Sequence, residues 1–199
     1  MIQLDKVVLN VVEAALSIFR ADVATYVPQL FWAESVANQA EIQTWFGNPQ
    51  KVIQTTVGFP TRSIVQPGIW AILQSSREPD DQELQSWGTT GEPGVYAIPH
   101  AGSVALVVAA PNQNYVLWLQ SVVQWALYTQ RPFLENSFGL HDQRIAASAL
   151  TPEPDSGGDV MFPFHRVWTL SCWYYDQYVQ PLTAITGASV TVEVTDSDA

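Results

Sequence analysis

The sequence contains little cysteine and little positive charge. Cys172 is the only cysteine among 199 residues, which excludes an internal disulfide and a structural zinc site built from several thiolates. We therefore expect a protein made in a reducing cytoplasm. Lys and Arg number 8 against 19 Asp and Glu, so the net charge is −11. A protein that grips nucleic-acid phosphates needs a basic surface, and this composition argues against a DNA-binding module.

Charge of either sign and long hydrophobic runs are also scarce. Charged residues make up 14% of the chain, whereas about 25% is typical of soluble domains. The longest apolar run, Val104–Pro111, has the length of a strand. The segment Met1–Phe19 carries charges at Asp5, Lys6 and Glu13, a pattern of neither a signal peptide nor a membrane span. We expect a soluble protein with no membrane partner.

Aromatic residues, in contrast, are abundant. They make up 12% of the chain and include eight Trp. Two interpretations remain open. Tyr and Trp are enriched in contact surfaces between proteins, because each combines a large apolar body with a polar tip. The same residues also fill an ordinary buried core.

Helical periodicity marks two long segments and one short one. Apolar residues recur at steps of three and four from Val8 to Tyr26, which predicts a helix over Leu4–Tyr26 that Pro28 closes. A second apolar stripe predicts a helix over Tyr115–Arg131, with Pro132 beyond its end. A shorter helix is expected over Glu34–Trp45.

Most of the remaining chain has strand character. Two strands are expected in Lys51–Val57 and Ile69–Leu73, and a hairpin is expected from Val95–Ile98 and Ser103–Ala110, turning around His100, Ala101 and Gly102. Further strands are expected near Arg144–Leu150, Phe162–Tyr178 and Ser189–Thr195. The predicted fold class is α/β (α+β): a mainly antiparallel twisted sheet with the two long helices packed on it, in a single domain over residues 1–199.

Two acidic segments rich in turn-forming residues predict exposed loops. They span residues 75–94 and 151–159, and Asp196–Ala199 reads as a frayed acidic end. The spacing of their carboxylates does not follow the order of an EF-hand calcium site. We expect solvated loops and no bound metal.

Catalytic signatures are missing from the sequence. No common nucleophile, zinc-protease, phosphate-loop or dinucleotide motif occurs, and His100, His141 and His165 lie far apart, in or beside predicted turns or strand starts. Cys172 and His165 are seven residues apart, which on one strand directs them to opposite faces. In extended backbone, the side chains of His141 and Asp142 would also diverge. We therefore expect no enzyme and no cofactor, and a buried Cys172.

The order of predicted elements resembles that of the tail-terminator proteins of long-tailed bacteriophages. The segments that carry this resemblance are the helix before Tyr26, the stretch Gly58, Phe59, Pro60, Thr61, Arg62 leading to Ile69–Leu73, the strand Val104–Ala109 running into Asn112–Asn114, and the helix Val116–Tyr128 followed by Gly139 and Leu140. The resemblance covers about residues 4–175.

The resemblance implies a structural role in a virion made in the host cytoplasm. Such subunits form a homo-hexameric ring that caps the tail tube, stops its elongation and joins it to the head-completion (neck or connector) proteins. The implied partners are copies of the chain itself, the tail tube protein, the connector protein and, in a contractile tail, the sheath protein. DNA would pass through the ring only as cargo.

Residues that face the channel or the assembly contacts can be predicted only from their places in loops and turns. Like charge keeps DNA from adhering to a channel wall, so the acidic loops suit a lumen. An unpaired edge of Val190–Val194 or of the Val95–Ala109 hairpin could join the sheet of a neighbouring subunit. The candidate residues are Glu78, Asp80, Asp81, Glu83, Trp87, His100, Asp155 and Asp159.

Three alternative functions remain open at this stage. Another phage neck or baseplate subunit would share the same sequence signals. A carbohydrate-binding module would use exposed aromatic side chains to stack on sugars, although two long helices and the lack of a secretion signal argue against it. An unrecognised hydrolase is the third alternative.

Overall fold

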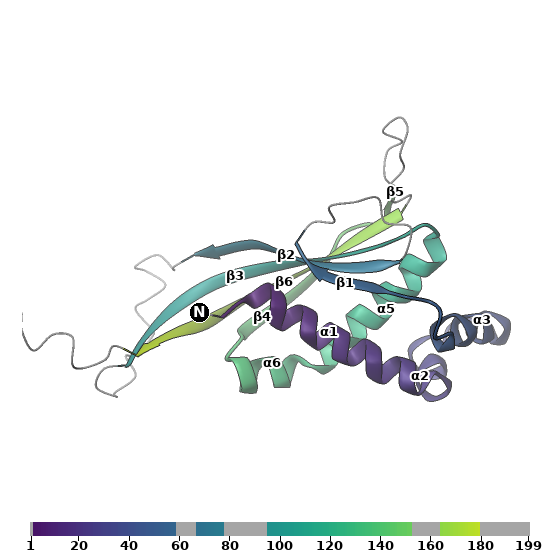
Figure 1. Cartoon of the computed structure of the whole chain (residues 1–199), viewed down its shortest axis with the longest axis horizontal. Helices are drawn as coiled ribbons and strands as arrows, with labels where there is room; N and C mark the ends of the chain where they lie inside the picture. Colours follow the sequence, from purple (N-terminus) through teal and green to yellow (C-terminus); the bar gives the residue numbers. More distant parts are fainter. Residues whose placement is uncertain (1, 59–66, 78–94, 153–163, 180–199) are drawn as a thin grey trace, which may run out of the picture.

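The computed structural model describes residues 2–58, 67–77, 95–152 and 164–179. These residues form a mixed six-stranded sheet with helices packed against one of its faces (Figure 1). The α/β class and the mainly antiparallel sheet predicted from the sequence are therefore confirmed. The predicted strand Ser189–Thr195, and nearly all of the two acidic loops, lie outside the described residues.

The first predicted helix is two helices, α1 (Leu4–Ala21) and α2 (Val23–Leu30). Asp22 interrupts the expected continuous helix, because its backbone leaves the helical conformation and its carboxylate accepts a hydrogen bond from the Thr25 N–H. Pro28 was expected to close the helix, but it lies inside α2. The chain changes direction at a capping residue instead, and the expectation about Pro28 was wrong.

Side-chain caps also begin the next two helices. Ser35 Oγ accepts from the Asn38 N–H at the start of α3 (Val36–Gly47), and Asn112 Oδ1 accepts from the Asn114 N–H at the start of α5 (Gln113–Thr129). Both helices match the predicted segments to within a few residues. Pro132 follows α5 and lies in the first turn of a further helix, α6 (Arg131–Phe138), a position that proline favours.

The strands are β1 (Gln54–Val57), β2 (Gly68–Arg77), β3 (Val95–Ala110), β4 (His141–Ala147), β5 (Thr151–Pro152) and β6 (Phe164–Val179). Their order across the sheet is β1-β2-β3-β6-β4, and β5 pairs with β6. All pairs are antiparallel except β1 with β2. The centre of the sheet is the pair of long strands β3 and β6, which are consecutive in space but distant in sequence.

The predicted hairpin in Val95–Ala110 was wrong, because this segment is one continuous strand of 16 residues. Gly102 was interpreted as a turn residue. It lies instead in mid-strand opposite Cys172, where a Cβ atom would come within 2.6 Å of Leu4 and 2.7 Å of Tyr174. Glycine is required here for close packing of the helix layer on the sheet, and the chain does not reverse.

The core lies between the sheet and the helices. It contains the apolar stripe of α1, the inner face of α5 and alternate residues of β3 and β6. Most of the described Trp residues belong to the interior: Trp45, Trp118 and Trp168 are buried in this core, Trp70 is buried on the opposite face of the sheet with Ala109 and Val107, and Trp125 and Trp173 are half-buried. The interpretation of the aromatic content as core residues therefore holds for most of the described Trp residues. Trp32, 79% exposed, is the exception.

Candidate assembly surfaces

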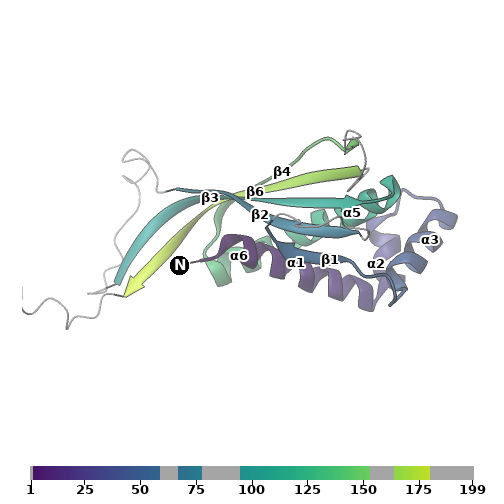
Figure 2. The same ribbon diagram turned by 45° about the horizontal axis from the view of Figure 1, so that its top comes forward.

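The central strand pair extends past the rest of the sheet. β3 and β6 pair over their full lengths, from Val95 with Val179 to Ala110 with Phe164. β2 stops pairing with β3 at Ala101, and β4 stops pairing with β6 at Trp173. Beyond those residues, within the described part of the chain, β3 and β6 form a two-stranded ribbon with no third strand (Figure 2). We call residues 95–100 and 174–179 the ribbon.

The two edges of the ribbon differ. Pro99 lies in β3 opposite Tyr175, and proline has no N–H to donate to a further strand. Proline is tolerated in a strand where its nitrogen faces away from the paired neighbour, so the outer edge of β3 lacks a donor there. By the alternation of the antiparallel ladder, Gln177 then directs its backbone N–H to the outer edge of β6. The β6 edge is the better one for strand addition.

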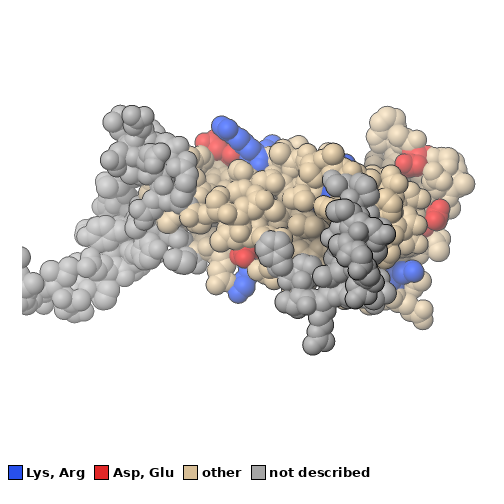
Figure 3. Space-filling view, turned by 90° about the horizontal axis from the view of Figure 1, so that it is seen from above, with Lys and Arg blue, Asp and Glu red and all other residues tan. Residues whose placement is uncertain are grey.

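A second candidate surface is the sheet face opposite the helices. In β3 and β6 the even-numbered residues, such as Leu106 and Leu170, pack against the helices, so the odd-numbered residues point the other way. None of the described odd-numbered residues from Ala101 to Ala109 or from His165 to Trp173 is Asp, Glu, Lys or Arg. The view onto this side is mostly uncharged (Figure 3). Its central strands thus carry no charge, but Trp70, Ala105 and Ala109 on this face are already buried within the chain, so only part of the face is open to another subunit.

His100 is the only candidate assembly residue from the sequence that falls within the described part of the chain. It is half-buried on the helix side of β3, opposite Tyr174, and the two rings stack at 5.5 Å between centroids. Its expected position in or beside a turn was wrong, because the strand continues through it. The other candidates, which lie outside the described residues, are Glu78, Asp80, Asp81, Glu83, Trp87, Asp155 and Asp159.

Cys172 is buried and His165 lies on the opposite face of the same strand, as the sequence predicted. Cys172 is buried on the helix side of β6, and His165 lies on the opposite side, an odd number of residues away. Burial raises the pKa of the Cys172 thiol from 9.0 to about 12, so the thiol stays protonated at neutral pH. Cys172 therefore acts as a small buried apolar residue.

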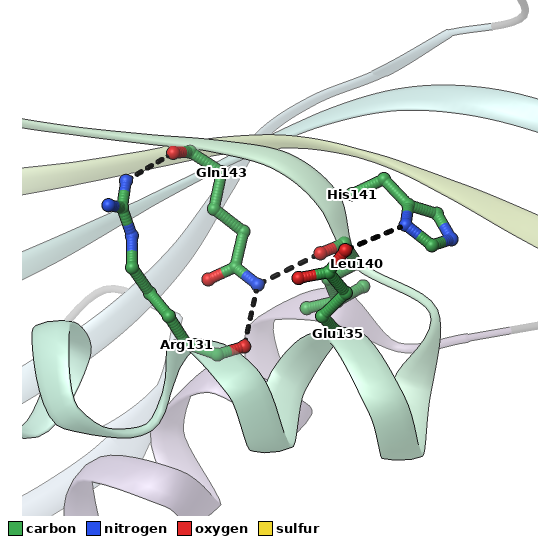
Figure 4. A network of polar contacts seen from close by, with 5 residues as sticks. All are labelled: Arg131, Glu135, Leu140, His141 and Gln143. Carbon is green, nitrogen blue, oxygen red and sulfur yellow. Dashed lines mark hydrogen bonds and ion pairs between the residues drawn. The ribbon is translucent and has the colours of Figure 1, made fainter.

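The region around His141 differs from the extended backbone assumed from the sequence. Asp142 has a positive φ of 49°, and the register between β4 and β6 shifts between His141 and Arg144. His141 Nδ1 lies 3.5 Å from a carboxylate oxygen of Glu135 on α6, an exposed contact (Figure 4).

Reciprocal hydrogen bonds between Arg131 and Gln143, which we call the clamp, join α6 to β4 next to Asp142. The Arg131 guanidinium donates to the backbone oxygen of Gln143, and Gln143 Nε2 donates to the backbone oxygens of Arg131 and Leu140 at 3.0 and 2.9 Å (Figure 4). The adjoining cavity, about 410 Å³, contains side chains of both charge signs. The clamp fixes the start of β4, an edge strand among those described, against α6.

The described residues contain neither a membrane-spanning helix nor a cluster of metal-ligating side chains. No helix among them is both long and apolar enough to cross a membrane. No group of three or more His, Cys, Asp or Glu in residues 2–58, 67–77, 95–152 and 164–179 could hold a metal ion.

The sequence did not predict the ribbon or the exposure of Trp32 and Val36. The ribbon was hidden by the interpretation of Gly102 as a turn, although the presence of Pro99 within an apolar stretch is itself a signal of an edge strand. Trp32 and Val36, 79% and 85% exposed, flank the cap of α3. Nothing in the local sequence distinguishes them from core residues.

Comparison with known proteins gives a similarity to solved structures but no match in sequence. No family model matches the sequence, and no curated protein matches it. Among solved structures, the chain is similar to one described as the sheath/tube terminator, in the extended state, of PVC, an extracellular contractile injection system. The two chains are 16% identical with a TM-score of 0.37, over 83% of this chain and 66% of that one, slightly less than two thirds of its length. That chain is described as a terminator, the class of protein that the sequence resemblance names, but of an injection system and not of a phage.

Proposed function

We propose that this chain is a structural subunit that forms a ring at the end of a tail-like tube, stops the growth of the tube and connects it to the next component. The observation that carries the proposal is the ribbon of β3 and β6. An isolated two-stranded ribbon is at best marginally stable in water, and a further strand would stabilise it. A neighbouring copy that adds a strand to β6 supplies this stabilisation.

If each copy binds its neighbour head to tail, strand addition can connect the copies in a closed ring. The ribbon lies at one end of the described sheet, and the edge strands β1 and β4 flank the other part (Figure 1). A ribbon that joins a different edge of its neighbour makes a heterologous interface, and a rotation that closes gives a cyclic oligomer. Six copies, a tube protein, a connector protein and, in a contractile tail, a sheath protein are the partners that the sequence resemblance implies.

The first experiment measures the mass of the purified protein by light scattering behind a sizing column, with and without isolated tube protein. A hexamer of the 22.0 kDa chain, or a monomer that forms rings on tubes and stops their elongation, supports the proposal. A chain that stays monomeric and does not affect tube growth contradicts it.

A matched pair of variants tests the role of the ribbon. Gln177→Pro removes the backbone N–H from the outer edge of β6, whereas Gln177→Ala keeps it. We expect the proline variant to remain monomeric and the alanine variant to assemble like the unaltered chain. Equal assembly of both variants would exclude strand addition at this edge.

The acidic residues of segment 75–94 remain candidates for the lumen of the ring. Neutralising Glu78, Asp80, Asp81 and Glu83 together should leave folding unchanged and should alter DNA passage or retention. Particles that deliver and retain DNA normally with all four residues neutralised would refute the channel role.

A further inference from the structure

A groove between α3 and α5 lies at the end of the molecule opposite the ribbon (Figure 1). Its volume is about 280 Å³. The residues that line it are Phe31, Glu34, Asn38, Glu41, Asn114, Leu117, Trp118, Gln120 and Ser121. The proposed ring contact does not use this groove.

The two walls of the groove follow helical spacing. On one side, Glu34, Asn38 and Glu41 recur at steps of four and three, and on the other, Asn114, Leu117 and Ser121 recur at steps of three and four. The α5 wall therefore presents one helix face over about two turns, roughly 10 Å at 1.5 Å per residue. The other wall begins at Glu34 in the turn before α3 and continues along the first turns of that helix. A groove bordered by two helices can receive a third helix.

The groove combines a small apolar area with carboxylates. Phe31 and Trp118 are 7% and 8% exposed, so only their edges reach the groove, whereas Leu117 is half-buried and Glu34 and Glu41 are exposed on the α3 side. The Glu34 carboxylate accepts a hydrogen bond from Asn38 Nδ2, which holds it on the wall. An occupant must therefore offer both apolar and positively charged side chains.

The cations near the groove are already engaged. Arg166 on β6 donates to Gln120 Oε1 and to the backbone oxygen of Ser148. Arg20 on α1 donates to the backbone oxygens of Phe46 and Asn48, at the other end of α3. Neither guanidinium is hydrogen-bonded to the carboxylates of Glu34 or Glu41.

Exposed apolar surface continues beyond the groove. Trp32 belongs to the same turn as Phe31 and Glu34, and Gln39 Nε2 fixes that turn by donating to the backbone oxygens of Phe31 and Glu34. Trp32 is 79% exposed. Trp is enriched among the residues that dominate binding energy at interfaces, and a fixed turn lowers the entropy lost when it binds.

We propose that this groove and Trp32 bind an amphipathic basic helix of a different protein. Its apolar side would contact Phe31, Leu117 and Trp118, and its Lys or Arg side chains would approach Glu34 and Glu41. A second copy of this chain is a poorer occupant of this groove, because the chain has only 8 Lys and Arg to offer against 19 Asp and Glu.

The test is a titration of the full chain with a fluorescent amphipathic peptide of Leu and Lys, about four helical turns long, followed by anisotropy. We expect Glu41→Lys and Trp32→Ala each to weaken binding at least about tenfold. Both side chains are exposed, so thermal unfolding should confirm that each variant folds.

Two controls separate the groove from general charge attraction. Glu135→Lys makes the same charge change on α6, outside the groove, and should change the affinity less than about twofold. A peptide of Leu and Glu with the same pattern should not bind. Equal weakening by Glu41→Lys and Glu135→Lys, or equal binding of both peptides, would overturn the proposal.

A different occupant would also be detected. If the chain self-associates and Glu41→Lys abolishes that association, then the groove binds a second copy and the proposal is wrong. The outcome is independent of the ring proposal, because the matched Gln177 variants alter only the opposite end of the molecule.

Discussion

The substitution Gly102→Ala tests how the helix layer packs on the ribbon strands. The added methyl would lie 2.6 Å from Leu4 Cδ2 and 2.7 Å from Tyr174 Cε1, whereas carbon atoms in contact prefer about 3.5–4.0 Å. Both neighbours must move by about 1 Å. Leu4 is 1% exposed and Tyr174 is 3% exposed, and the Tyr174 hydroxyl is tied to Ser76 Oγ at 2.7 Å, so there is little room to move.

Overpacking of this kind costs about 1–3 kcal/mol, and replacing Gly by Ala returns up to about 1 kcal/mol through the unfolded chain. We therefore expect a free energy of unfolding lower by about 1–2 kcal/mol. In urea unfolding followed by Trp fluorescence, that loss lowers the midpoint by about 0.5–1 M for an m value near 2 kcal/mol/M. An unchanged or raised midpoint would refute the packing argument.

A double-mutant cycle identifies the neighbour responsible. Leu4→Ala alone should cost about 2–5 kcal/mol, because it empties a buried site. In the Gly102→Ala background the same change should cost less, because the new methyl occupies part of the vacated space. Costs that add to within about 0.5 kcal/mol would show that the two sites do not touch.

Three further predictions concern the thiol, the tryptophans of α5 and the exposed histidine. Burial raises the pKa of the Cys172 thiol from 9.0 to about 12, so between these pH values the thiol ionises only in the unfolded chain, and the free energy of unfolding should fall as pH rises. In urea unfolding at a series of pH values, Cys172→Ala should make the midpoint fall less steeply with pH. Trp118→Glu should unfold the chain and Trp125→Glu should cost less, since Trp118 is 8% exposed and Trp125 only half-buried, as circular dichroism melts would show. His141→Ala should change the unfolding free energy by less than about 1 kcal/mol, because the contact between His141 and Glu135 is exposed. A larger loss would mean that the imidazole of His141 stabilises β4 through other contacts.

Periodic segments could be predicted from the sequence because the signal and the structure have the same physical origin. The stripe from Val8 to Phe19 packs onto the sheet as the spacing required, and Asn112 caps α5 as its side chain allowed. The predicted segment Phe162–Tyr178 became β6, since β-branched and aromatic residues fit a half-buried strand. These elements depend on local residues.

Features that depend on distant neighbours were not predictable. Gly102 has the same local sequence whether it turns the chain or admits Leu4 and Tyr174 from elsewhere. The groove between α3 and α5 likewise depends on a helix pair brought together by folding. The division of the first helix at Asp22 was missed for a different reason: its cap to Thr25 is local, but the apolar period runs through Asp22 without a break.

The scarcity of charge has a different structural explanation from the abundance of aromatic residues. Most described Trp side chains serve the core, so the aromatic content does not by itself indicate a contact surface. Charge is absent from the central strands on the sheet face opposite the helices, where the odd-numbered residues are small or β-branched for most of their length, from Ala101 and Ser103 to Val167 and Thr169. A face of a monomer in water gains solubility from charge and has no reason to exclude it. A face that meets another subunit does, because each buried charge must be paired or lose its hydration. Of these odd-numbered positions, Ala105 and Ala109 are already buried within the chain, so the half-buried ones, such as Ser103 and Val107, are those open to the subunit contact that we propose.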